Sequence, residues 1–286
     1  IPFNKIIKKK KNLNKKNERE IGYPFINKNV DNSASRGIEI IKKKINEDLL
    51  NTYIIKAIKA SRCGYCIIEE YFFGKEYTVE SLFDINGKFH PCFITDRYFS
   101  HKSGKALETG LRNPSKLKPL IQKKIFSFAE KVAKKIGIKV GPAKFDLMIS
   151  NNKFIIIEMT TRLSGGFDCQ YLVPAATGKD VIRAAMLTSL GKEFDKKLLE
   201  SKINRVAMSS SIWPKPGKIK KIEYKKNKIH KNEYLRVFFT KKKNDEITSY
   251  ENCADRPCFI IAASQNEIKT KELINKAKKN IIIQTK

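Results

Sequence analysis

Two carboxylates and a guanidinium lie close together near the middle of the chain, in stretches that otherwise look like buried strands. Asp146 belongs to AKFDLMI at 143–149, Glu158 belongs to FIIIEMT at 154–160, and Arg162 follows just before a Gly-Gly turn. An ionised side chain costs several kcal/mol to remove from water without a partner, so a strand that only needed burial would not carry such groups. We therefore expect a charged ligand at the end of the second strand.

The spacing of these two stretches predicts an antiparallel hairpin. If a three-residue loop joins them, Asp146 lies directly opposite Glu158, and both side chains project from one face. The candidates for that loop are Asn151, Asn152 and Lys153. A four-residue loop would place the carboxylates on opposite faces. Facing carboxylates repel each other unless a cation lies between them, and such oxygen ligands suit Mg²⁺ with a phosphate as a further ligand. The alternative is a solvated pair, because a hairpin can leave one face in water.

A second stretch has the composition of a loop that binds anions. The strand-like GYPFINKNV at 22–30 runs into DNSASRG at 31–37, which consists of small and turn-forming residues. Such a loop can direct several backbone N–H groups at an anion, and Arg36 adds positive charge. It differs from the GxxxxGK[ST] motif, so taken alone it does not identify a nucleotide site.

Acidic residues gather in the stretch at 66–90, CIIEEYFFGKEYTVESLFDINGKFH. Its pattern predicts two strands, broken at Gly74, with a hairpin turn at Asn86-Gly87. The four glutamates of this stretch before the turn are Glu69, Glu70, Glu76 and Glu80. Further along, apolar residues at helical spacing predict an amphipathic helix at 118–136 that ends at Gly137.

Composition narrows the class of protein. The chain has 286 residues, 41% of them hydrophobic, which is enough for one large or two moderate domains. The net charge of +30 suggests a nucleic-acid partner, but lysine far outnumbers arginine, the residue that grips phosphates and bases bidentately. We therefore expect no specific nucleic-acid binding. Because no apolar run reaches the length of a membrane span, we expect a cytoplasmic protein with no membrane partner.

Two further features lead to expectations. Cys63 and Cys66 have the spacing of a redox pair or half a zinc site, but no second such pair follows, so we expect small buried side chains. The chain starts at Ile1 in what reads as the middle of a domain. We therefore expect an N-terminal part to precede it.

Three stretches together resemble a known family. GYPFINKNVDNSASRG, IIEEYFFGKEYTVESL and GPAKFDLMI followed by FIIIEMTTRLSGG occur in the order and at the spacing of the ATP-grasp superfamily. The resemblance is closest to its carboxylate-amine ligases and to the biotin carboxylase and carbamoyl phosphate synthase branch, and it covers most of residues 20–190. It implies an α+β fold in which two α+β subdomains clasp ATP, with a small β-rich C-terminal subdomain and with the family's N-terminal α/β domain missing. The expected domains are 1–200 and 201–286.

The resemblance also assigns roles to individual residues. Lys28 would contact the nucleotide phosphates, and the lid over them would include Ser33, Ser35, Arg36 and Gly37. The adenine hinge would comprise Glu69, Glu70, Tyr71 and Phe72, and Glu76 would bind the ribose. Asp146, Glu158 and Thr160 would hold Mg²⁺, with Mn²⁺ as an alternative, and Arg162 would face the transferring phosphoryl group.

The implied activity is that of an ADP-forming ligase, in which a substrate carboxylate attacks ATP to give an acyl phosphate and an amine then attacks the acyl group. The partners would be small carboxylates and amines, and such ligases often form homodimers. The stretch 106–117, which contains Glu108, Arg112 and Ser115, would be either part of the acceptor site or a surface loop. Thr160 replaces a common Asn of the family, and Asn29 replaces a common Pro. Thr160 and the expected missing N-terminal part motivate an alternative, a non-catalytic ATP-binding module or a degenerate homologue.

Overall fold

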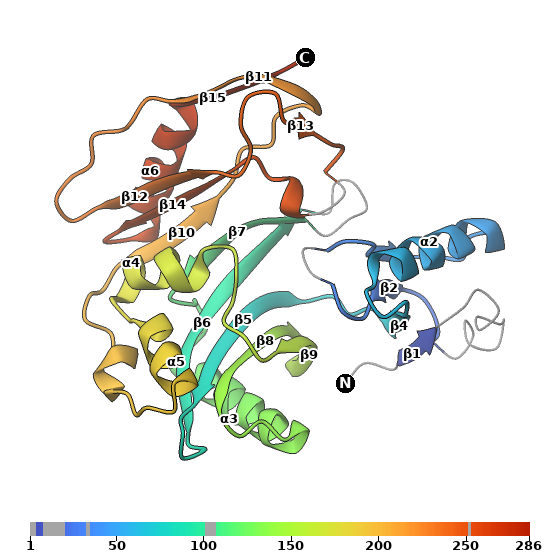
Figure 1. The fold of residues 1–286 in the computed structure, drawn as a ribbon, viewed down its shortest axis with the longest axis horizontal. Coiled ribbons are helices and arrows are strands. Elements are labelled where there is room, and N and C mark those ends of the chain that lie inside the picture. Colours follow the sequence, from blue (N-terminus) through green and yellow to red (C-terminus); the bar gives the residue numbers. More distant parts are fainter. Residues whose placement is uncertain (1–3, 8–20, 33–34, 101–106, 251–252) are drawn as a thin grey trace.

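The computed structural model describes residues 4–7, 21–32, 35–100, 107–250 and 253–286, which form three antiparallel sheets with helices packed against them (Figure 1). This is the α+β class that the sequence predicted. Within these ranges, no helix combines the length and apolar character that crossing a membrane requires.

A four-stranded sheet and one helix form a small N-terminal subdomain, drawn in blue in Figure 1. The sheet order is β1-β4-β2-β3, and the elements are β1 (Asn4–Ile7), β2 (Phe25–Asn29), β3 (Glu39–Ile41), β4 (Cys66–Glu70) and α2 (Glu47–Ala60). The Asn46 side chain caps α2 by accepting a hydrogen bond from the Leu49 amide. Cys66 belongs to the core beneath α2, whereas Cys63 is exposed, so the prediction of a buried side chain was wrong for Cys63.

An eight-stranded sheet forms the body of the molecule, in the order β12-β14-β10-β7-β6-β5-β8-β9. Its strands are β5 (Lys75–Phe83), β6 (Phe89–Ser100), β7 (Leu107–Asn113), β8 (Gly141–Ser150), β9 (Lys153–Thr160), β10 (Val206–Ser210), β12 (Tyr234–Phe239) and β14 (Cys258–Ser264). Because β10 pairs with β7, strands from both sides of the expected boundary at residue 200 share this sheet. The division into 1–200 and 201–286 stays a prediction.

The C-terminal part adds a small third sheet, in the order β13-β11-β15. Its strands are β11 (Gly217–Tyr224), β13 (Glu246–Ile247) and β15 (Ile281–Thr285). Helix α6 (Glu267–Lys279) packs between this sheet and β10 and β14, through Leu273, Ile274 and Ala277. Apolar contacts of these helix residues with both sheets hold the C-terminal part on the body.

The two faces of the large sheet differ in character. Helix α3 (Pro119–Ile136), which ends at Gly137 as predicted, covers one face and packs on Val79 and Phe145. Because successive strand residues point to opposite faces, Thr78, Glu80 and Asp146 point to the other face. Part of that second face is covered by a π-helix (Asp168–Leu172), α4 (Val173–Thr177) and α5 (Val181–Ser189). Glu76 and Asp146 of the predicted site thus lie on the face of the large sheet opposite α3.

The loop between β8 and β9 differs from the prediction. Ser150 pairs with Lys153, so the turn contains two residues, Asn151 and Asn152, and the predicted three-residue loop was wrong. Both turn residues have positive φ, 46° and 61°, as a tight hairpin turn requires. Asparagine tolerates this conformation better than most residues, which explains its presence at both positions.

A β-bulge nevertheless produces the predicted pairing. With a two-residue turn alone, the partner of Asp146 would be Ile157. The register shifts by one residue between Asp146 and Leu147, and Asp146 pairs with Glu158. The prediction that these carboxylates face each other is therefore confirmed, for a reason that the sequence did not reveal.

Gly74, between β4 and β5, provides a test of how closely the start of β5 packs on β8. A Cβ at this position would clash with the Ile149 carbonyl oxygen and would lie 2.7 Å from Met148 Cγ. Gly74→Ala should therefore lower the free energy of unfolding by about 1–3 kcal/mol, the usual cost of overpacking, in a urea titration. Gly165→Ala is the matched control, because no atom lies within 4 Å of a Cβ there. Equal losses in the two variants would contradict the prediction.

Candidate active site

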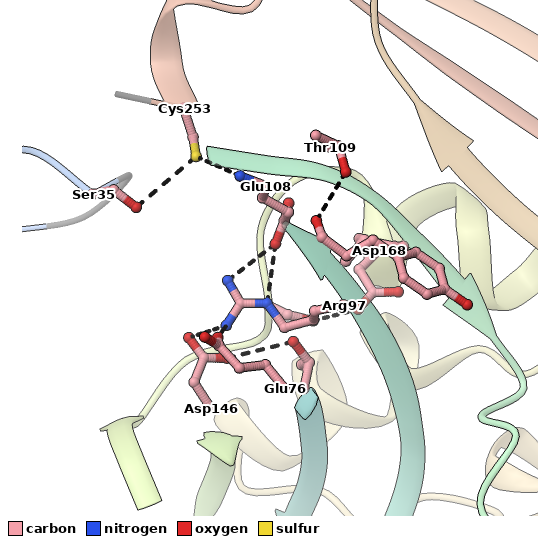
Figure 2. A network of polar contacts seen from close by, with 12 residues as sticks. Ser35, Glu76, Arg97, Glu108, Thr109, Asp146, Asp168 and Cys253 are labelled. Carbon is pink, nitrogen blue, oxygen red and sulfur yellow. Dashed lines mark hydrogen bonds and ion pairs between the residues drawn. The ribbon is translucent and has the colours of Figure 1, made fainter. Parts of the chain in front are cut away.

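The candidate site lies on the open face of the large sheet, where four adjacent strands each place one charged side chain. β7, β6, β5 and β8 carry Glu108, Arg97, Glu76 and Asp146, respectively. Figure 2 shows these side chains converging on the Arg97 guanidinium. Glu108 belongs to β7, so the surface-loop interpretation of this residue was wrong.

Arg97 forms the centre of this group. Its Nη1 lies 3.0 Å from Asp146 Oδ2 and 3.4 Å from Glu76 Oε2, and its Nε donates to Glu108 Oε2 at 3.0 Å. Burial alone would lower the pKa of the guanidinium, but the three carboxylates raise it. Sequence reasoning missed Arg97. The available signal was a charged residue inside the strand-like run ITDRYFS, which does not tell which carboxylates it meets.

Glu108 connects this group to the C-terminal part of the chain. Its Oε1 lies 3.4 Å from Arg256 Nη1, and its amide donates to Cys253 Sγ at 3.4 Å. Arg256 Nε donates to the Cys253 carbonyl oxygen, and its guanidinium lies 4.3 Å from the centre of the Phe259 ring. Ser35, from the predicted phosphate lid, places its hydroxyl 3.9 Å from Cys253 Sγ (Figure 2). The contacts of Cys253 with Glu108 and with Ser35 could not be predicted from local pattern, because they join segments more than 140 residues apart.

The predicted metal ligands come together at the β8–β9 pair. Asp146 is buried, whereas Glu158 opposite it is exposed. Burial would raise the pKa of the Asp146 carboxyl, but Arg97 and Lys144 lower it, and Lys144 Nζ lies 2.7 Å from Asp146 Oδ2. The buried Thr160 hydroxyl has no hydrogen-bond partner among the described residues.

These residues fit a magnesium ion that is shared with phosphate. Two carboxylates and an unpaired hydroxyl supply oxygen ligands only, and Mg²⁺ commonly takes one or two carboxylates plus substrate phosphates. In the described part of the chain, no group of three or more His, Cys, Asp or Glu side chains could hold a metal by itself.

Lys28 crosses from the small sheet to the large one. Its Nζ lies 2.6 Å from Glu69 Oε2 on the neighbouring strand β4, and it donates to the Ile157 carbonyl oxygen at 3.1 Å. Ile157 is the residue that the β-bulge leaves unpaired. The structure thus brings the predicted phosphate ligand Lys28 and the predicted adenine-hinge residue Glu69 together as an ion pair.

The remaining hinge residues lie where the chain leaves the small sheet. Glu70 is exposed, Tyr71 and Phe72 are half-buried, and the Tyr71 amide donates to the Pro24 carbonyl oxygen. Glu76 follows at the start of β5. Burial raises the pKa of its carboxyl, and Arg97 opposes that rise.

The predicted phosphate lid is organised by the residue that departs from the family pattern. Asn29 accepts a hydrogen bond from the Asn32 amide at 2.6 Å and donates to the Arg36 carbonyl oxygen at 2.5 Å. Gly37 has a φ of 65° and packs close to α2, where a side chain would have little space. Ser33 lies outside the described residues. Asn29 thus closes the base of the loop on β2.

Arg162 lies beyond the end of β9 and is exposed. Its Nη1 donates to the Leu163 carbonyl oxygen at 3.0 Å. It borders an open groove of about 490 Å³ whose wall includes Ile182, Met186 and Leu190 of the α5 segment. The guanidinium is therefore accessible to a ligand at the end of the sheet face.

The other residues considered for the acceptor side have structural partners. Arg112 Nε donates to Glu267 Oε2 of α6 at 3.1 Å. Ser115 Oγ donates to Asp96 Oδ1 at 2.5 Å. The first contact joins β7 to helix α6 of the C-terminal part, and the second joins the segment after β7 to β6.

Comparison with known proteins identifies the family of this fold. Residues 21–170, more than half of the chain, match the ATP-grasp domain family. The chain belongs to the ATP-grasp family.

Solved structures share the fold at low sequence identity. An L-amino acid ligase from Bacillus licheniformis matches with a TM-score of 0.76 and 20% identity, over 100% of this chain and 68% of that one. Phosphoribosylglycinamide synthetase from Anaerococcus prevotii matches with a TM-score of 0.68 and 22% identity, over 100% of this chain and 70% of that one. A third match is the biotin carboxylase domain of a Hydrogenobacter thermophilus 2-oxoglutarate carboxylase in complex with MgADP. Its TM-score is 0.70 at 20% identity, over 94% of this chain and 59% of that one.

Removal of the Arg97 charge should destabilise the fold strongly. Arg97→Met leaves three carboxylates without their shared guanidinium, so we expect a loss of about 3–5 kcal/mol in urea unfolding at neutral pH. The difference in the free energy of unfolding between the parent and Arg97→Met should become smaller as pH falls below about 4. At such pH the parent loses the stabilisation that ionised Asp146 provides. Arg162→Met is the control, because an exposed arginine with a carbonyl contact should change stability by no more than about 0.5 kcal/mol. Similar losses in both variants would contradict the role given to Arg97.

Proposed function

We propose that this chain binds ATP with Mg²⁺ between its small and large sheets and that it is the nucleotide-binding part of an ADP-forming carboxylate-amine ligase. The observation that carries the proposal is the pairing of Asp146 with Glu158 on β8 and β9, with Arg162 beyond it and Lys28 reaching over it. Family membership supports the nucleotide. The names of the similar structures, which include a synthetase, an amino acid ligase and a biotin carboxylase, support the reaction class.

The nucleotide would lie along the open face with its base at the hinge. In this proposal the adenine contacts the Glu69–Phe72 segment, Glu76 binds the ribose hydroxyls, and Lys28 leaves Glu69 to contact the phosphates. In the described part of the predicted lid, Ser35, Arg36 and Gly37 would contact the phosphates with backbone N–H groups. Asp146 and Glu158, with the Thr160 hydroxyl, would hold Mg²⁺, which when bound neutralises charge on the triphosphate.

The chain's own residues would then position the reaction. A substrate carboxylate attacks the γ-phosphorus of ATP, the bond to the β-phosphate oxygen breaks, and ADP leaves. An amine next attacks the acyl phosphate carbon and displaces phosphate. Arg162 faces the transferring group, where a fixed guanidinium stabilises the charge that develops. The substrates are small molecules in the cytoplasm, and Mn²⁺ can replace Mg²⁺.

A second candidate function is a module that binds ATP without turnover. Two observations favour it, the Thr160 hydroxyl in place of a better amide ligand and the pairing of Lys28 with Glu69. The two functions make different predictions. A ligase releases ADP when its carboxylate and amine are present, whereas the module binds nucleotide and releases none.

Nucleotide binding can be tested by thermal stabilisation. Mg²⁺ with a non-hydrolysable ATP analogue should stabilise the parent by about 2.7 kcal/mol at a hundredfold excess over the dissociation constant. Lys28→Ala and Glu158→Gln should each reduce that shift. Lys123→Ala, on the exposed side of α3, should leave it unchanged. A parent that is folded but shows no shift would contradict nucleotide binding by this chain.

Turnover can be tested separately through Arg162. Arg162→Ala should keep the thermal shift with the ATP analogue but lower ADP release with carboxylate and amine panels by about 10²–10³-fold, the usual effect of losing one donor to developing charge. Arg162→Lys should recover part of the rate. ADP release by Arg162→Ala at the parent rate would contradict the catalytic role. Binding without any ADP release in the parent would favour the second candidate.

A further inference from the structure

Two buried carboxyl groups lie directly beneath the turn that follows Arg162. Glu80 of β5 is 0% exposed and Asp168 of the π-helix is 1% exposed. Both approach Ser164, the first residue of the Ser-Gly-Gly turn, from different elements of the fold. Neither carboxyl group has a role in the proposed reaction.

Glu80 holds the backbone of the turn. Its Oε2 accepts a hydrogen bond from the Ser164 amide at 2.8 Å and one from Cys169 Sγ at 3.6 Å. Its Oε1 has no hydrogen-bond partner within the described ranges. A carboxylate that served only to satisfy one amide would be an expensive choice in a buried site, because the charge must be desolvated.

Asp168 holds the side chain of the same residue. Its Oδ2 lies 3.5 Å from Ser164 Oγ, and its Oδ1 accepts from Thr95 Oγ1 of β6 at 3.3 Å. Ser164 Oγ also lies 3.2 Å from Cys169 Sγ. The amide and the hydroxyl of Ser164 are therefore fixed by two acids, one from the sheet and one from the helix that follows the turn.

Burial raises the pKa of both carboxyl groups toward the neutral range. Burial raises the pKa of Glu80 to about 7, opposed by its hydrogen bonds and by Lys144 of β8. Burial, reinforced by the charges of Glu80 and of Glu108 on β7, raises the pKa of Asp168 to about 8. The thiols of Cys169 and of Cys92 on β6 also face Glu80, and the pKa of each is raised by burial.

We propose that Glu80 and Asp168 are positioning residues, which fix Ser164 and thereby direct Arg162 and the Gly165–Gly166 backbone toward the phosphoryl-transfer end of the site. The contacts of the turn do not depend on the proposed function. The role of the groups that the turn positions rests on that function. The chain Glu80–Ser164–Asp168 links β5, the turn and the π-helix, so a change in either acid should loosen the turn and leave the nucleotide-binding residues in place. Ionisation of both acids in this small volume would place two like charges on either side of Ser164.

A pH-dependent stability follows from the same pair. An acid whose pKa is raised on folding stabilises the folded state below its unfolded pKa, about 4, and that stabilisation is lost as pH rises through the folded value. The stability of the parent should therefore fall as pH rises from about 5 to about 8. Glu80→Gln and Asp168→Asn should flatten this fall. Asp96→Asn, which changes a buried acid that contacts Ser115 instead, should retain it.

The decisive experiment combines hydrogen exchange with this pH profile, on the complete chain without any ligand. In Glu80→Ala, the Ser164 amide should exchange about tenfold faster or more, because it loses a hydrogen bond to a carboxyl group. Glu80→Gln, which keeps an acceptor oxygen, should restore protection to within about threefold. Unchanged exchange in Glu80→Ala would overturn the proposal. The proposal would also be overturned if Glu80→Gln and Asp168→Asn both kept the pH dependence of stability that the parent shows. This second test can be made even if Glu80→Ala does not fold.

A third arm separates this proposal from the proposed function. If the parent releases ADP, Asp168→Asn should lower kcat with little change in KM for ATP, because the turn lies at the transfer end and away from the hinge. Equal changes in kcat and KM would overturn the positioning role. If the parent binds no nucleotide, the proposed function fails, while exchange and the pH profile still decide whether the acids fix the turn.

Discussion

The contact of Arg97 with three carboxylates is the constraint on which the rest of the site depends. Glu108, Glu76 and Asp146 come from β7, β5 and β8, the strands that lie on either side of the Arg97 strand and beyond it. Because every side chain must point to the same face, the register of four strands is fixed together. A slip of one residue in any strand would bury an unpaired charge, which is far costlier than loss of a surface ion pair.

The bulge on β9 connects the site on the large sheet to the small N-terminal subdomain. It lets a two-residue turn coexist with the pairing of Asp146 and Glu158, and it frees the Ile157 carbonyl oxygen from the sheet ladder. Lys28 of the small sheet donates to that oxygen. One irregularity in a strand thus places a predicted metal ligand and also provides the point where the two sheets meet over the site. A nucleotide that takes Lys28 would exchange this contact for contacts with phosphate.

The sequence predicted those features that depend on local pattern. Helix α3 and its end at Gly137 follow from apolar spacing and from a glycine in left-handed conformation. The facing of Asp146 and Glu158 was predicted correctly from an incorrect loop, because the extra loop residue that was assumed is replaced by the extra residue of the bulge. The family resemblance was confirmed over residues 21–170, whereas the assigned nucleotide and metal roles stay predictions.

Long-range pairing could not be predicted in the same way. From the sequence, Arg97 is recognisable only as a charged residue within a predicted strand. Its three partners depend on the order of strands in the sheet, which one sequence does not specify. The same holds for the contact of Cys253 with Glu108 and for the ion pair of Lys28 with Glu69. Glu80 could be seen in the acidic stretch, but its burial under Ser164 depends on the path of the chain after β9.

The most direct test of the account is a crystal structure of the chain with Mg²⁺ and a non-hydrolysable ATP analogue. In that structure the base should lie at the Glu69–Phe72 segment, the metal should lie between Asp146 and Glu158, and Lys28 Nζ should have moved from the Ile157 carbonyl oxygen to a phosphate. A nucleotide bound elsewhere, or bound here with Lys28 still paired to Glu69 and no metal at Asp146 and Glu158, would contradict it.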